Sequence, residues 1–375
     1  MARHACMVHR ATLLIATLLS IIFGIHCECD GICVPMHKCK SNTFGGFVVD
    51  TRIGDDEESV DDCNHYLEVC CDKEDVVEHV TAHPVAPTDA GPCPAPGDRQ
   101  FAECGIRHIR GVGMRLAYTT NEAEFGEFPW MVALFTEDSI HGRKYICGGS
   151  LIEPNVIMTA AHCVFNKTSE TIIVRAGEWD FQTENEIRRH QEATVQQVIV
   201  HQFFHESYLF NDVALLILER PFVADDHIQT ICLPPAKTTF NGQNCFVSGW
   251  GKEKWDSDSY KAILKKVELP IVSHSECQTA LRSTGLGKKF RLHSTFLCAG
   301  GEKDIDSCSG DGGSPLVCPM PNQYNKYYQA GIVAWGIRCG QEGIPGVYVR
   351  SAIYTDWIHE TINDLQNGGT IFVNN

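Results

Sequence analysis

The chain has 375 residues, of which 43% are hydrophobic and 21% charged, and its formal net charge is −16. This length predicts two or three domains, and an acidic balance without a basic, aromatic-rich surface excludes a nucleic-acid-binding protein. The 19 cysteines are typical of an extracellular, disulfide-stapled protein.

The N-terminus has the pattern of a secretory signal. Arg3 and Arg10 accompany a charge-free, mostly apolar stretch at 11–25, and polar sequence follows. This stretch is short for a transmembrane helix, and no later run is long and apolar enough to span a membrane. We therefore expect residues 1–26 to be a signal peptide, and the mature protein to be secreted without a membrane anchor.

Residues 28–72 contain six closely spaced cysteines. A segment this short buries too small a core to be stable unaided, which predicts a small disulfide-rich domain. Six cysteines allow fifteen connectivities, so the spacing alone leaves the pairing open. The cysteines are Cys29, Cys33, Cys39, Cys63, Cys70 and Cys71.

The loop between the third and fourth of these cysteines is acidic, and Arg52 is the only basic residue between Lys40 and Cys63. Residues 28–103 carry 17 acidic and 5 basic side chains, a net charge of 5 − 17 = −12. A solvated loop and a docking face for a basic partner both fit this charge. Arg52-Ile53 presents a basic and then an aliphatic residue in a glycine-flanked segment. We predict that cleavage between them is a switch.

A change of composition marks the next boundary. Residues 73–103 are rich in proline, alanine and acids, which predicts a semi-extended linker. Beyond it, short β-rich segments such as 172–174 and 195–200 alternate with turns, a pattern typical of antiparallel barrels. Helical spacing at 354–365 predicts a terminal helix, and 367–375 is expected to be a tail.

Three motifs in this region carry a histidine, an aspartate and a glycine-rich loop, in that order along the chain. They lie at residues 159–163, 211–216 and 308–315. They read Thr-Ala-Ala-His162-Cys, Asn-Asp212-Val-Ala-Leu-Leu and Cys-Ser-Gly-Asp-Gly312-Gly-Ser-Pro. Acyl transfer needs a nucleophile held against a histidine base, and a glycine supplies no side-chain atom for that purpose.

Together these motifs resemble those of trypsin-like serine proteases of the chymotrypsin clan, with which they share the order of the catalytic residues. The resemblance covers residues 104–366. It implies an all-β domain of two six-stranded antiparallel barrels with a C-terminal helix. His162 and Asp212 match the base and its carboxylate, whereas Gly312 stands at the position of the catalytic serine. The resemblance therefore implies a protein that is not an enzyme.

Three further departures from the family pattern bear on activity. Ser314 lies two residues too late to place its hydroxyl on His162, because productive contact needs roughly 2.6–3.2 Å. Ala334 replaces a serine that usually supports the triad aspartate. The domain also lacks the Ile-Val-Gly-Gly start whose freed amine, in active relatives, pairs with the aspartate that matches Asp311. We expect the usual zymogen switch to be lost, and Gly312→Ser alone to restore little hydrolysis.

The resemblance also implies a substrate pocket for arginine or lysine, with Asp306 at its base. The pocket walls match Trp335, Gly336 and Gly346. The disulfides implied for this domain are Cys104–Cys232, Cys147–Cys163, Cys245–Cys318, Cys277–Cys298 and Cys308–Cys339. The pairing of Cys27 and Cys93 depends on the signal cleavage site and stays open.

The six-cysteine segment resembles the clip domain of arthropod immune proteases, which implies the bridges Cys29–Cys70, Cys33–Cys63 and Cys39–Cys71. The whole chain is similar to clip-domain serine protease homologues that act as cofactors of prophenoloxidase activation in haemolymph. This implies a binding cofactor in melanisation, with prophenoloxidase or an upstream clip-domain protease as partner and oligomerisation after cleavage. The alternatives are an active trypsin-like endopeptidase and a decoy that binds proteases through its pocket.

Two ligand or modification sites complete the predictions. The segment 177–186 resembles the calcium loop of trypsin-like domains, with Glu178, Asp180 and Glu186 as ligands for Ca²⁺. A solvated acidic loop would look the same. Asn166 opens the Asn-Lys-Thr sequon and is the predicted glycosylation site.

Overall fold

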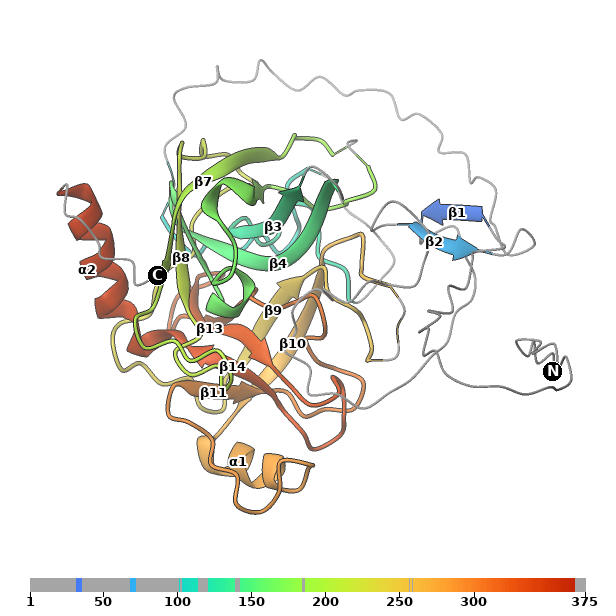
Figure 1. The fold of residues 1–375 in the computed structure, drawn as a ribbon, viewed down its shortest axis with the longest axis vertical. Coiled ribbons are helices and arrows are strands. Elements are labelled where there is room, and N and C mark those ends of the chain that lie inside the picture. The colour runs from blue at the N-terminus through green and yellow to red at the C-terminus, as the bar shows by residue number, and fades with distance from the viewer. Residues whose placement is uncertain are drawn as a thin grey trace, which may run out of the picture.

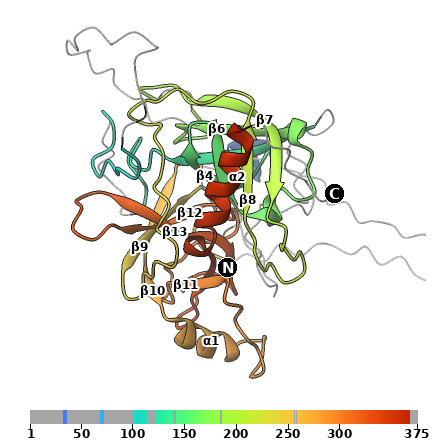
Figure 2. The same ribbon diagram turned by 90° about the vertical axis from the view of Figure 1, so that its left-hand side faces the viewer.

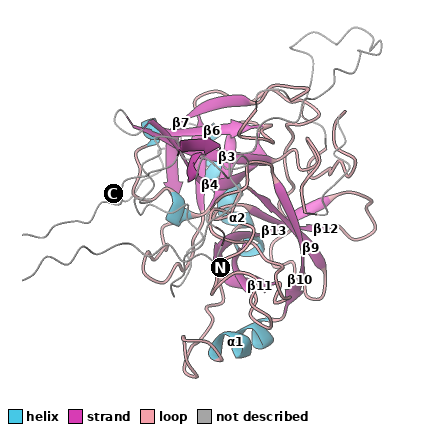
Figure 3. Ribbon diagram, turned by 90° about the vertical axis from the view of Figure 1, so that its right-hand side faces the viewer, coloured by secondary structure: helices cyan, strands magenta, loops and turns pink. Residues whose placement is uncertain are grey.

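Two antiparallel β-barrels form the main body of the protein (Figure 1). The computed structural model describes residues 32–35, 68–71, 101, 103–113, 121–138, 142–183, 186–255, 257 and 259–367. Strands dominate this part of the chain, and helices are short (Figure 3). The predicted fold class of two six-stranded barrels and a C-terminal helix is confirmed.

The first barrel closes in the strand order β3-β4-β5-β8-β7-β6. Its strands contain the segments 172–174 and 195–200 that were predicted from β-rich composition. Buried and less buried positions alternate along β6, as expected for a strand with one face on the core. The strands are β3 (Met131–Asp138), β4 (Gly142–Glu153), β5 (Val156–Thr159), β6 (Ile172–Ala176), β7 (Gln191–Val200) and β8 (Ala214–Leu218).

The second barrel closes in the order β10-β11-β14-β13-β12-β9. A nine-residue helix, α1 (His274–Arg282), follows β10, and Ser273 caps it by accepting a hydrogen bond from the amide of Glu276. The strands are β9 (Asn244–Gly249), β10 (Lys265–Val272), β11 (Phe296–Ala299), β12 (Pro315–Pro319), β13 (Tyr327–Trp335) and β14 (Gly346–Arg350).

Aromatic side chains join the two barrels into one continuous core. Trp250 follows β9 and is fully buried, and its ring centroid lies 4.7 Å from that of Phe181 and 6.3 Å from that of Tyr145 on β4. Large buried aromatic rings contribute strongly to packing. This contact fixes the loops of one barrel against those of the other, which is where the candidate site lies.

The terminal helix α2 (Thr355–Gln366) runs from the second barrel up beside the first (Figure 2). Thr355 donates a hydrogen bond to the carbonyl of Pro234, and Ile358 and Ile362 are buried.

In the N-terminal region the structure describes only β1 (Ile32–Pro35) and β2 (Glu68–Cys71), which pair antiparallel. In the described ranges, no helix has the length and hydropathy needed to cross a bilayer.

Five disulfides stabilise the barrels. Cys104–Cys232 attaches the start of the domain, and Cys147–Cys163 ties β4 to the turn that carries His162. Cys245–Cys318, Cys277–Cys298 and Cys308–Cys339 brace the second barrel. These are the pairs implied by the family resemblance. The three pairs implied for the six-cysteine segment, and the peptide bond Arg52-Ile53, lie outside the residues whose side chains the structure describes.

Candidate functional site

A paired histidine and aspartate lie on the first barrel. His162 belongs to a short 3₁₀ turn (Ala161–Cys163), and Asp212 lies just before β8. The carboxylate of Asp212 is fully buried, accepts a hydrogen bond from the backbone N–H of His162 at 2.8 Å and lies 2.6 Å from Nδ1. These contacts fix the orientation of the ring. Although Ala334 replaces the serine that usually supports the aspartate, His162 and Asp212 therefore still contact each other.

The other nitrogen of His162, Nε2, is buried and has no hydrogen-bond partner among the described residues. A catalytic base of this kind would hold the proton of a nucleophile here. The cysteines beside it do not make a metal site, because Cys147 and Cys163 are joined in a disulfide. Asp212 thus orients the ring of His162, and Nε2 is the ring nitrogen that a nucleophile would contact.

The turn that carries His162 packs against a loop of the second barrel, since a Cβ built on Gly313 would lie 3.4 Å from the backbone nitrogen of Ala160. This loop contains Gly312. Its carbonyl accepts a hydrogen bond from the amide of Gly148 on β4 at 2.9 Å, and Tyr145 donates its hydroxyl to the carbonyl of Gly310 at 2.9 Å. The first barrel therefore holds the backbone of the loop in place although position 312 has no side chain.

Ser314 is fully buried beside the same loop, which excludes a surface position for this residue. Its hydroxyl packs so closely on Gly148 that a Cβ built there would lie 2.1 Å from Oγ. In the part of the chain that the structure describes, neither Ser314 Oγ nor His162 Nε2 has a hydrogen-bond partner, so the two do not bond to each other. Ser314 therefore does not take the place of the missing nucleophile.

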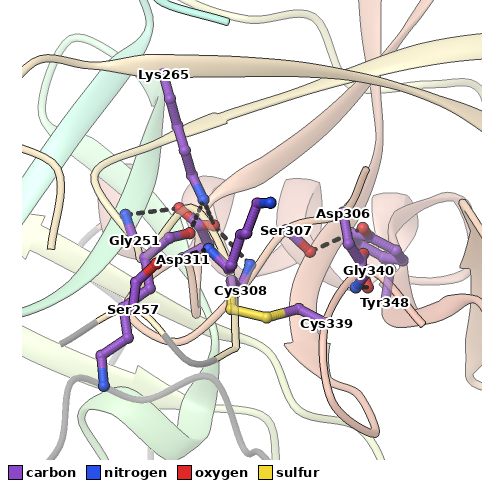
Figure 4. The surroundings of a disulfide bond; sticks show 12 residues. Gly251, Ser257, Lys265, Asp306, Ser307, Cys308, Asp311, Cys339, Gly340 and Tyr348 are labelled. Atoms are coloured by element: carbon purple, nitrogen blue, oxygen red, sulfur yellow. Dashed lines mark hydrogen bonds and ion pairs between the residues drawn. A yellow bond between two sulfur atoms is a disulfide. The ribbon is translucent and has the colours of Figure 1, made fainter. Parts of the chain in front are cut away.

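The residues of the expected substrate pocket lie on neighbouring segments. Asp306 is buried and accepts a hydrogen bond from the amide of Gly340 at 3.2 Å, and Ser307 Oγ lies 2.9 Å from the hydroxyl of Tyr348 (Figure 4). The disulfide Cys308–Cys339 ties these segments together. The remaining pocket residues are Trp335 at the end of β13, Gly336 directly after it, and Gly346 at the start of β14.

Sequence reasoning missed one member of this region, Lys265, the first residue of β10. Its ammonium lies 2.6 Å from the carboxylate of Asp311, the residue before Gly312. In an active relative, a freed terminal amine is expected at this carboxylate. A signal was present in the sequence, because Lys265 lies in phase with the buried Leu269 and Ile271 on the inner face of its strand.

The expected calcium ligands lie on one segment of the first barrel, but their carboxylate oxygens do not all lie within 4.8 Å of one another, and they already have protein partners. Glu178 is 2.8 Å from Arg175 and 3.3 Å from His190. The amide of Asp180 donates to Glu186 at 3.3 Å. Burial and the neighbouring carboxyl of Glu178 raise the pKa of Glu186 to about 7. The carboxyl of Glu186 therefore keeps its proton to higher pH than an ordinary glutamate does.

The site has the orienting groups of acyl transfer and the barrel architecture that carries them. The described residues place no hydroxyl or thiol within hydrogen-bond distance of His162 Nε2. Proton abstraction by a histidine is productive only when a nucleophile lies against it. The fold and the site together define a trypsin-like domain without a complete catalytic triad.

Comparison with known proteins gives the same class. The family described as Trypsin matches residues 118–358, and the family described as Serine protease Clip domain PPAF-2 matches residues 22–72. The chain therefore belongs to the trypsin family, in the branch that carries an N-terminal clip domain.

Among individual proteins, the chain is 47% identical to "Phenoloxidase-activating factor 2" of Galleria mellonella over 72% of this chain and 92% of that protein. It is 36% identical to "Inactive CLIP domain-containing serine protease A8" of Anopheles gambiae, over 90% of each chain. It is 35% identical to "Inactive CLIP domain-containing serine protease A28" of the same mosquito, over 96% of each chain. The chain is thus a relative of non-catalytic clip-domain proteins.

Proposed function

We propose that this protein is a secreted, non-catalytic cofactor in a proteolytic cascade that activates phenoloxidase. The observation that carries the proposal is the oriented His162–Asp212 pair, which faces a loop with glycine at position 312. Gly312 replaces the catalytic serine, and the buried Ser314 does not substitute for it. Without a hydroxyl at position 312 the site has no nucleophile, so acyl transfer cannot begin.

Binding is the activity that such a domain retains. Both barrels are closed, and hydrogen bonds hold the loops at their junction, which supports a preorganised surface around the former active site. Preorganised surfaces bind with a small ordering cost. The names of the relatives point to phenoloxidase activation. The partners we propose are the prophenoloxidase zymogen and the clip-domain protease that cleaves it, in haemolymph.

Reconstitution tests this function. The purified protein is mixed with prophenoloxidase and its activating protease from the same animal, and phenoloxidase activity is measured as the protein is titrated. We expect activity to rise with the amount of protein added. Treating only this protein with a serine-directed fluorophosphonate, and then removing the reagent, is expected to change nothing. Loss of the effect after this treatment would show that the protein acts as a protease.

We propose further that cleavage after Arg52 controls the cofactor. The support is in the sequence, where Arg52 is the only basic residue between Lys40 and Cys63 and precedes the acidic run at 55–62. The cut pieces stay linked if the clip disulfides pair as the family resemblance implies. The new acidic end then becomes available for docking or oligomerisation.

The matched variants for this switch are Arg52→Gln, which removes the trypsin-like cleavage site, and Arg52→Lys, which keeps it. We expect the lysine variant to be cut and to support phenoloxidase activation, and the glutamine variant to do neither. Equal activation by the uncut glutamine variant would exclude the switch, while the cofactor function itself would stand.

We also propose a structural calcium site at Glu178, Asp180 and Glu186. The neighbouring carboxyls of Glu178 and Glu186 support it, since oxygen ligands suit Ca²⁺. The ion would supply positive charge in place of the proton on Glu186, while Arg175 would continue to neutralise part of the charge of Glu178. Asn166, which is exposed beside the turn that carries His162, is proposed to be glycosylated.

A further inference from the structure

The carboxylate of Asp311 is held inside the second barrel by several donors (Figure 4). It is fully buried and accepts hydrogen bonds from the amide of Gly251 at 2.9 Å and from the amide of Cys308 at 2.8 Å. A Cβ built on Gly251 would lie 2.5 Å from Asp311 Cγ, and one on Gly249 would lie 2.3 Å from Oδ1. The two glycines after Ser248 therefore leave the space that this carboxylate fills.

Lys265 provides the positive charge at this site. It lies opposite Gly249 in the antiparallel pair of β9 and β10, and its side chain reaches down to Asp311 (Figure 4). The ammonium lies 2.6 Å from Asp311 Oδ2 and donates a second hydrogen bond to the carbonyl of Lys252 at 2.5 Å. Only 4% of the lysine side chain is exposed. The ion pair is thus shielded from water and salt.

A buried carboxylate without a cation is costly, and removal of one partner of a buried ion pair is strongly destabilising. Any trypsin-like domain that turns Asp311 inward must therefore supply a positive charge. A terminal amine becomes available only after cleavage, whereas a lysine on β10 is present as soon as the chain folds. The source of the positive charge therefore decides whether the loop 308–314 becomes ordered only after cleavage of the chain.

We propose that Lys265 is a built-in counter-ion that orders this loop in the uncut chain, so that the trypsin-like domain has no cleavage-dependent switch at its own start. The ammonium occupies the position at Asp311 where a new terminal amine would have to bind. Arg115 is the basic residue of this chain that precedes the expected start of the domain. A cut after Arg115 then leaves the loop unchanged. The inference goes beyond the cofactor role, because it concerns how the domain reaches its binding-competent conformation.

The test compares Lys265→Ala with Lys261→Ala. Lys261 is the matched control, because it lies four residues before Lys265 and forms a partly exposed ion pair with Glu253. Backbone hydrogen exchange is measured in peptides that contain the amides of Gly251 and Cys308, whose acceptor is Asp311. We expect exchange of these amides to be at least tenfold faster in the Lys265 variant and unchanged in the control. Equal exchange in the two variants would overturn the proposal.

Chemical rescue separates a missing cation from a general loss of packing. Propylammonium chloride replaces the three carbons and the ammonium that Lys265→Ala removes. We expect it to restore protection of the two amides in this variant, compared with sodium chloride at the same ionic strength, and to have no effect on the wild type. Failure of the amine to restore any protection would contradict the role of Lys265 as a counter-ion.

A cleavage site for a highly specific protease, inserted after Arg115, tests independence from the cut. We expect the same exchange at Gly251 and Cys308 before and after cleavage, and slower exchange after cleavage would overturn the proposal.

Should Lys265→Ala fail to fold, Lys265→Met is compared with the uncharged double variant Lys265→Met, Asp311→Asn. The double variant is expected to unfold at the higher temperature, and the opposite order would contradict the ion-pair argument.

Discussion

The two barrels contribute to the former active site in different ways. The first barrel keeps His162 and Asp212 in a buried, hydrogen-bonded pair. The second barrel presents a loop whose backbone is held by Gly148 and by the Asp311–Lys265 ion pair, but its position 312 has no side chain. Both barrels thus keep the scaffold of the site, but the second barrel lacks the hydroxyl that catalysis needs.

This difference follows from what each side chain does for the fold. Asp212 and Asp311 are fully buried and satisfy backbone N–H groups, so their loss would leave donors without partners. A hydroxyl at position 312 serves only the reaction. Groups with a structural role are therefore costly to remove even in a protein that no longer performs catalysis, and a group with a purely chemical role is not.

Asp212→Ala should have the largest effect on stability in the first barrel. The substitution leaves the backbone N–H and Nδ1 of His162 without partners, and we expect a loss of about 3 kcal/mol. For a domain of this size, that corresponds to a decrease in Tm of roughly 6–12 °C. Asp364→Ala, at an exposed position on α2, is the control and should change stability by less than about 0.5 kcal/mol. Equal Tm values would refute a structural role for Asp212.

Gly251→Ala probes the second barrel at the carboxylate of Asp311. The added methyl would lie 2.5 Å from Asp311 Cγ, so we expect a loss of about 2 kcal/mol from overpacking. Gly287→Ala is the control, since Gly287 has a φ of +79° but open space around it. Backbone strain alone should cost about 1 kcal/mol there. Denaturant unfolding measures both, and a smaller loss for Gly251→Ala would mean that Asp311 is not tightly packed.

Calcium should stabilise the first barrel in a pH-dependent way. Because the pKa of Glu186 is raised to about 7, the proton favours the folded state below pH 4.5, and this contribution is lost as the pH rises through 7. Calcium needs the ionised carboxylate, so it should raise Tm more at pH 8 than at pH 5.5. At ten times its Kd the gain at pH 8 is about 1.4 kcal/mol, roughly 3–5 °C.

The control for calcium is a pair of variants. Glu186→Gln should lose the effect of calcium on Tm, whereas Glu170→Gln, at an exposed position on the same barrel, should keep it. A calcium effect that is independent of pH, or that persists in Glu186→Gln, would place the ion elsewhere.

Much of the fold could be predicted from the sequence, because local patterns determine it. β-Branched residues in short segments such as 172–174 mark strands, and the motifs around His162 and Asp212 define the family. The geometry of the histidine–aspartate pair was harder to predict from the sequence. The sequence shows that Ala334 replaces a serine, but it does not show whether His162 and Asp212 still contact each other. Their contact depends on backbone that belongs to several strands.

Lys265 shows what sequence reasoning overlooked. A lysine in phase with Leu269 and Ile271 indicates an inward-facing charge, but the partner of that charge lies 46 residues further along the chain (311 − 265). Only the closure of the barrel brings the two together. The same holds for the hydroxyl of Ser314, whose burial against Gly148 depends on contact between the barrels.

Active-site labelling tests most directly the claim that the histidine and the loop are assembled around position 312 although the nucleophile is missing. The uncut wild type, Gly312→Ser and Gly312→Ala are each exposed to a fluorophosphonate probe, and the labelled residue is identified by mass spectrometry. We predict label at residue 312 of the serine variant, without prior cleavage, and none in the other two proteins. Turnover of an arginine amide needs the substrate pocket as well and is expected to stay low. Labelling of the wild type, or an unlabelled serine variant that is folded, would contradict the claim.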